Sequence, residues 1–293
     1  MIEEVLYKYL TGSKELGAML TQYAKAPAIF KDDVPPDTDK SWASGPQYPR
    51  IVYTLNMRDD PQRKVSGTLM VDIMCYGNIQ PGTIEAVLRP MIDGHFFTDG
   101  DTTIAAMWES SPAFTEQAGK YIISGVTVNF DVVAFPVQLT SNPDPIQALN
   151  CWMKEQLPEV TVIGHDELPA VWTPDPKRPA VYFKLDALGK GTLRDTYSVA
   201  WHLATIKGLV ISTNREVRNK VSKYIVDALA AKSRVQLADG SPFFLRRLAA
   251  NMAADPIKEG QLTITGEYGV LTKKQVYPIL NNLFKDDLPT IRS

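Results

Sequence analysis

Ile29-Phe-Lys-Asp-Asp-Val-Pro35 and Ile163-Gly-His-Asp-Glu-Leu-Pro169 are two versions of one sequence pattern. Each begins with an apolar residue, continues through two acidic residues to an aliphatic one, and ends in proline. Self-similarity over a long period marks a repeated structural unit. The pattern therefore predicts that the second half of the chain repeats the first.

The alignment extends outward from this pattern, at a shift that grows from about 130 to about 141 residues. Tyr48-Pro-Arg-Ile-Val-Tyr-Thr-Leu55 matches Arg178-Pro-Ala-Val-Tyr-Phe-Lys-Leu185. Beyond it, apolar residues alternate with polar or small ones in both copies, which predicts half-buried strands. The alternating positions are Leu69, Val71, Ile73 and Cys75 in the first copy, and Val199, Trp201, Leu203 and Thr205 in the second.

Helical periodicity completes the repeated unit. Apolar residues at spacings of three and four predict amphipathic helices at 84–91 and 217–228, and opening helices at 2–10 and 146–157. Asp-Gly turns at 99–100 and 239–240 precede a closing strand in each copy. The predicted fold class is α+β, with two similar domains, each a small antiparallel sheet flanked by helices.

The 293 residues suffice for two domains. The first copy is predicted at 1–138, and the second, diverged copy at 146–277. Residues 139–145 contain two prolines, which favour an extended linker. Residues 278–293 have no counterpart in the repeat and form a C-terminal extension.

Charge is unevenly distributed between the two halves. The chain has 31 Lys and Arg and 33 Asp and Glu, which gives a formal charge of −2. Residues 1–138 contain 11 basic and 17 acidic residues, whereas residues 139–293 contain 20 basic and 16 acidic residues. This asymmetry indicates that the halves face different neighbours, or each other.

Composition excludes several classes of protein. With 44% hydrophobic residues the chain is not disordered, and no apolar run is long enough for a membrane-spanning helix. The acidic, amphipathic start is unlike a signal peptide, so we expect a soluble protein. Cys75 and Cys151 stand in apolar stretches, which predicts buried free thiols in a reducing compartment.

No catalytic, cofactor or metal motif is found, and we expect no enzyme activity. His95, His165 and His202 stand outside any metal-ligand spacing. Leu188-Gly-Lys-Gly-Thr192 lacks the phosphate-loop pattern and is predicted to be a hairpin turn. The basic stretch 215–234 is predicted to be the solvated face of a helix, with DNA contact as the alternative.

The order of these elements resembles a known family. The first copy has a short helix, the segment Asp32-Asp33-Val34-Pro35-Pro36, the strand Tyr48-Pro-Arg-Ile-Val-Tyr53, a second strand from Leu69 to Tyr76, a helix and a closing strand near 126–135. This order is similar to that of the tail terminator or neck (head-tail joining) proteins of tailed bacteriophages. The resemblance covers residues 1–138 and, more faintly, 145–277. The fusion of two units and the C-terminal extension depart from the family.

The resemblance implies a structural virion protein assembled in the bacterial host cytoplasm. Such proteins form a ring that caps the tail tube, stops its polymerisation, and joins it to the connector or, in contractile tails, to the last sheath ring. We expect six chains in the ring, with three as the alternative, and DNA passing through the channel without sequence-specific binding. The implied partners are tail tube protein, connector or neck, and sheath protein, with no membrane.

We expect the interfaces of the ring in polar loops, in the basic last third of the chain and in the extension. The alternative function is a tandem α+β ligand-binding or regulatory module without catalysis. The candidate interface residues are Asp37, Lys40, Trp42, Asp59, Asp60, Arg63, Arg246, Arg247, Ile279, Leu283 and Phe284.

Overall fold

The computed structural model describes residues 1–43, 47–58, 64–118, 121–138, 142–193, 195–196 and 198–271. The predicted extension at 278–293 lies outside these residues. So do six of the candidate interface residues: Asp59, Asp60, Arg63, Ile279, Leu283 and Phe284.

The first unit is an eight-stranded sheet with three helices. Its sheet has the order β11-β6-β7-β9-β5-β4-β3, in which β11 (Val171–Trp172) comes from the second half of the chain, and β8 pairs with β9 beside this path. The elements are α1 (Ile2–Gly12), α2 (Lys14–Met19), β1 (Gln22–Tyr23), β2 (Ala26–Pro27), β3 (Ile29–Lys31), β4 (Arg50–Met57), β5 (Gly67–Tyr76), α3 (Pro81–Ile92), β6 (Phe96–Asp99), β7 (Thr102–Ser110), β8 (Ala113–Ala118) and β9 (Tyr121–Ala134).

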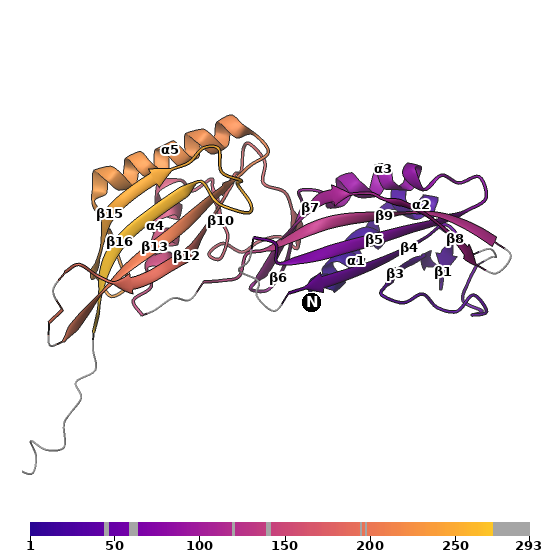
Figure 1. Cartoon of the computed structure of the whole chain (residues 1–293), viewed down its shortest axis with the longest axis horizontal. Coiled ribbons are helices and arrows are strands. Elements are labelled where there is room, and N and C mark those ends of the chain that lie inside the picture. The colour runs from indigo at the N-terminus through magenta and orange to yellow at the C-terminus, as the bar shows by residue number, and fades with distance from the viewer. Residues whose placement is uncertain are drawn as a thin grey trace, which may run out of the picture.

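The second unit is a six-stranded sheet with two helices, in the order β10-β12-β13-β16-β15-β14. Figure 1 shows the two units end to end along the long axis of the molecule. The elements are α4 (Pro145–Gln156), β10 (Thr161–Val162), β11 (Val171–Trp172), β12 (Ala180–Lys190), β13 (Val199–Ile211), α5 (Arg215–Lys232), β14 (Arg234–Gln236), β15 (Pro242–Ala250) and β16 (Leu262–Leu271).

The two sheets have the same strand order. The first sheet has the order β6-β7-β9-β5-β4-β3 after β11, and the second sheet, read from its other edge, has the order β14-β15-β16-β13-β12-β10. Each strand of one series corresponds to the strand at the same place in the other. In each, one short strand pairs in parallel, β3 with β4 and β10 with β12, while the other pairs are antiparallel. The strand β11 lies in the second half of the sequence but pairs with β6 of the first sheet.

Strand register corrects part of the sequence alignment. Ile51 lies opposite Ile73, and its counterpart Val181 lies opposite Val210. Ile73 therefore corresponds to Val210 and not to Leu203. The hairpin of β12 and β13 is longer than that of β4 and β5, so the extra residues fall within the strands.

The predicted fold class is wrong. The structure is mostly β, with 42% of its described residues in strands and 23% in helices, and it contains two curled half-barrel sheets, not small sheets flanked by helices. In each unit the helices pack against one face of the curled sheet, and the first helix lies near both of its edges: α1 contacts β3 and β6, and α4 contacts β10 and β14. Curling brings those edges toward one helix.

Each unit has its own hydrophobic core between sheet and helices. In the first, Leu6 and Leu10 of α1 are buried at a spacing of four residues against the strands of the sheet. In the second, Leu149 of α4 and Ile225 of α5 are buried in the same way. Apolar stripes at helical spacing thus meet the alternate residues that the strands direct to this face.

A third core joins the two units. Phe96 and Phe135 of the first unit pack with Tyr182 of the second, with the ring centroids of Phe135 and Tyr182 5.3 Å apart. The Tyr182 hydroxyl donates a hydrogen bond of 2.7 Å to the Pro136 carbonyl, and burial raises the pKa of this phenol. Lys258 Nζ lies 2.5 Å from Asp131 Oδ2 across the same junction. The units therefore share apolar and polar contacts.

Candidate interface groove

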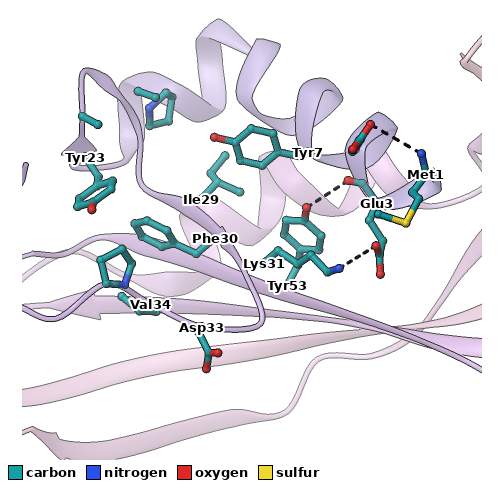
Figure 2. A pocket seen from close by; sticks show the side chains of 15 residues that line it. Met1, Glu3, Tyr7, Tyr23, Ile29, Phe30, Lys31, Asp33, Val34 and Tyr53 are labelled. Carbon is teal, nitrogen blue, oxygen red and sulfur yellow. Dashed lines mark hydrogen bonds and ion pairs between the residues drawn. The ribbon is translucent and has the colours of Figure 1, made fainter.

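A groove of about 890 Å³ runs between α1 and the edge of the first sheet. Figure 2 shows Tyr7 of the helix facing Ile29 and Phe30 of β3 across this space. We call it the α1–β3 groove. Its lining is mostly apolar, and the residues are Met1, Glu3, Glu4, Tyr7, Tyr23, Ala24, Ala26, Pro27, Ile29, Phe30, Lys31, Asp33, Val34, Pro35 and Tyr53.

Polar contacts fix one end of the groove. Lys31 Nζ lies 2.7 Å from Glu3 Oε2, and this hydrogen bond raises the pKa of Lys31. The Tyr53 hydroxyl donates a 3.2 Å hydrogen bond to the Glu3 carbonyl, while burial raises the pKa of Tyr53 to about 12. Glu3 thereby ties the helix to both β3 and β4.

The strand β3 forms the edge of the first sheet. It has three residues, Ile29–Lys31, and among the described residues it pairs only with β4. An edge strand offers unpaired backbone donors and acceptors to another chain. The groove thus combines an apolar lining with a strand edge, which suits a protein partner.

An aromatic cluster supports the other end of the groove. The rings of Tyr23, Phe30 and Trp42 lie 5.0–5.5 Å apart in edge-on pairs. Trp42 is only 9% exposed, and its indole donates a 3.1 Å hydrogen bond to the Pro36 carbonyl. This corrects the expectation that Trp42 is a surface contact, because its side chain holds the loop from inside.

Two other predicted residues lie on this loop. Asp37 is exposed and forms a 3.1 Å ion pair with Arg50, whose guanidinium lies over the Tyr48 ring. Lys40 is exposed. The structure therefore places Asp37 and Lys40 on the surface beside the Trp42 cluster.

Arg246 and Arg247 lie far along the chain, on β15 of the second unit, and outside the groove lining. Arg246 donates hydrogen bonds of 3.0 and 2.7 Å to Glu267 Oε2. The backbone amide and hydroxyl of Thr192 each donate to Glu267 Oε1 at 2.6 Å. Arg246 is thus paired within its own chain, and both Arg246 and Arg247 are exposed.

We expect Glu267 to make a contribution to the stability of the fold that is lost in acid. Burial raises its pKa, but the hydrogen bonds from Thr192 and Arg246 outweigh burial and hold the pKa below its usual range. The contribution is therefore present at neutral pH and lost as pH falls through the folded-state pKa. We expect Glu267→Gln to lower the free energy of unfolding by about 3 kcal/mol at pH 7 and by less in acid.

Urea unfolding at several pH values measures this effect. Glu159→Gln removes an exposed carboxylate of the second unit and is the matched control. An equal loss for both variants, or a loss at Glu267 that does not shrink in acid, would contradict the assignment.

The other candidate chemical sites have structural roles. Asp166 accepts hydrogen bonds from Lys154 Nζ at 2.7 Å and from the Val162 amide at 3.0 Å, which fixes the turn after β10. Within the described residues no group of three or more His, Cys, Asp or Glu side chains is placed to hold a metal ion.

The two thiols differ from the prediction. Cys75 is buried, as expected, and burial raises its pKa to about 11, but Cys151 is exposed on α4. The apolar stretch around Cys151 belongs to the other side of that helix, where Leu149 and Trp152 face the core.

The sequence did not predict the groove, because none of the candidate interface residues lines it. Tyr7 and Phe30 were not predicted as interface residues, although the spacing of Glu3 and Tyr7 places these two residues on one side of a helix.

No described helix combines the length and apolar character needed to cross a membrane. No protein-family model matches the chain, and no curated protein matches its sequence.

Proposed function

We propose that the chain is a structural protein of a tailed-phage virion, of the tail terminator or neck class, that assembles as a ring. The observation that carries this proposal is the α1–β3 groove, where an apolar lining and an open strand edge lie together. Both features suit a protein partner, and a ring is the closed form of a repeated contact between unlike surfaces.

The order of elements supports the choice of class. The elements on which the resemblance rests occur in the chain in the expected order. They are the helix α1, the acidic and proline-containing segment 32–36, the strands β4 and β5, the helix α3 and the strand β9. The larger, curled sheet has further strands within this order, because β6, β7 and β8 lie between α3 and β9.

Charge supports a second copy of the chain as the occupant of the groove. Glu3, Glu4 and Asp33 line the groove against Lys31, and residues 1–138 carry an excess of acidic groups. Residues 139–293 carry an excess of basic groups, so the second unit of one copy complements the first unit of the next. This contact is head-to-tail and therefore repeats around an axis.

Six chains fit this ring better than three. With three chains, the first and second units would alternate as equivalents around one ring. The units differ in charge, and only the first contains β8. We therefore place one unit of each chain in a sixfold ring on the tail tube, with the other toward connector, neck or sheath, and DNA in the channel.

Light scattering over a range of concentrations, with negative-stain images of the same fractions, tests the proposal. We expect a ring of six times the 32.5 kDa chain mass. A ring of three chain masses would support alternating units instead. A monomer at every concentration would contradict ring closure by the chain alone.

The alternative of a ligand-binding module has its own test. The volume of the α1–β3 groove lies within the range of small-molecule sites. We expect no heat when the protein is titrated with calcium or nucleotides in a calorimeter. Saturable heat that disappears when Tyr7 is changed to Glu would favour the module over the ring.

A further inference from the structure

The sequence pattern of the two units occurs a third time within the C-terminal extension, which corrects the expectation that the extension has no counterpart in the repeat. Leu283-Phe-Lys-Asp-Asp-Leu-Pro289, near the C-terminus, matches both Ile29-Phe-Lys-Asp-Asp-Val-Pro35 and Ile163-Gly-His-Asp-Glu-Leu-Pro169. The match to the second version continues beyond proline, where Thr290-Ile-Arg292 aligns with Ala170-Val-Trp172, each a small residue followed by a β-branched one.

The second version of the pattern leads into a strand that completes a sheet edge. Val171 lies opposite Phe97 and Trp172 opposite Phe96, so β11 covers the outer edge of β6. The Thr98 amide donates a 2.9 Å hydrogen bond to the Ala170 carbonyl, and Val171 packs against the first core. The residues after the pattern thus act as an added strand.

The strand β14 occupies the place of β6 in the second sheet. It ends the strand order, and among the described residues it pairs only with β15. The Leu245 amide of β15 donates to the Ser233 carbonyl, and the Leu237 amide donates to the Ser241 carbonyl just before β15. Alternation therefore directs the backbone groups of Arg234 and Gln236 to the outer edge. Within the part of the chain that the structure describes, the edge that β11 covers in the first unit is therefore open in the second.

A groove of about 970 Å³ lies beside this edge, between α4 and the β14–β15 hairpin. Trp152 lines it, is 3% exposed, and has an indole N–H without a hydrogen-bond partner among the described residues. A buried unpaired donor is costly, and a backbone carbonyl entering the groove would pair it.

We propose that residues 286–292 bind along β14 of the same chain as an added antiparallel strand, as β11 binds β6. Ile291 then lies opposite Val235, whose side chain belongs to the second core. An extended chain from Leu271 to Thr290 spans about 60 Å, while β14 lies two strands from β16, about 10 Å away. So short a tether favours binding within the chain over exchange between copies.

This inference is independent of the proposed ring, and Cys151 provides its test. Cys151 is exposed and lines the groove, whereas Cys75 is fully buried and does not report. We expect Ellman's reagent to label Cys151 about tenfold faster in a chain ending at Lys285 than in the full chain. Equal labelling rates would overturn the proposal.

A substitution within the full chain separates strand pairing from the loss of eight residues. Ile291→Asp is expected to raise the labelling rate as far as truncation does, because it places a charge against the second core. Asn282→Asp, with the same added charge outside the pattern, is the matched control and is expected to leave the rate unchanged. A similar rise for both variants would overturn the proposed register.

Protein concentration identifies the source of the strand. Protection of Cys151 that is independent of concentration supports binding within the chain. Protection that appears only as concentration rises would overturn this assignment and identify a second copy as the occupant.

Discussion

Phe135→Ala is expected to lower the free energy of unfolding by about 3–5 kcal/mol. Phe135 is 1% exposed and packs against both Phe96 of the first unit and Tyr182 of the second. Its removal leaves a cavity between rigid sheets that cannot close around it. The third core is therefore weakened on both sides at once.

Urea unfolding followed by tryptophan fluorescence measures this loss. The shared core predicts one cooperative transition for the unchanged protein and two separated transitions for Phe135→Ala. Ile122→Ala, at a position on β9 that is 68% exposed, is the control and is expected to change stability by less than about 0.5 kcal/mol. A Phe135→Ala variant as stable as this control would show that the two units do not depend on their junction.

Tyr7→Glu combined with Val34→Asp is expected to prevent ring assembly. Both residues line the α1–β3 groove, which already contains Glu3, Glu4 and Asp33. A buried charge without a partner at an interface costs about 2–5 kcal/mol, so two such charges exceed what a repeated contact of ordinary strength withstands. Light scattering is expected to find monomers at concentrations where the unchanged chain forms rings.

A matched variant separates loss of the groove from added charge. Ile79→Asp with Tyr224→Glu introduces the same acids at side chains that are 44% and 40% exposed, on the turn after β5 and on α5. It is expected to assemble normally. Rings of unchanged mass from the Tyr7 and Val34 variant would contradict a groove contact between copies.

The sequence predicted turns and element order better than strand register. Gly100 and Gly240 both have positive φ in tight turns between strands, as the Asp-Gly pairs predict. The register of β13 was harder to predict from the sequence because this strand is apolar on both faces. Ile206 belongs to the second core, whereas Leu209 belongs to the core between the units. A period of two residues does not distinguish those faces.

The proportion of strand was underestimated for a related reason. Short strands such as β6, β14 and β11 have too few residues to show a period, and their pairing depends on residues distant in the sequence. The curl of the sheets also depends on tertiary packing. Local patterns therefore predicted helices and long strands but not two half-barrels.

The candidate groove was missed because its residues come together only in three dimensions. Tyr23 and Phe30 lie on different short strands, and Trp42 follows a polar loop that suggested exposure. Their mutual packing converts that loop into a support for the groove. Polar loop composition indicated the neighbourhood, whereas the apolar lining required the fold.

The crossing of β11 has a consequence for protein synthesis. The first sheet is complete only when Val171 and Trp172 have left the ribosome, well after β9 ends at Ala134. Until then the edge of β6 is open and Phe96 lacks its contact with Trp172. The first unit therefore completes its sheet only after part of the second unit has been synthesised. A chain cut at the linker lacks β11, so the edge of β6 stays exposed to pairing with other chains.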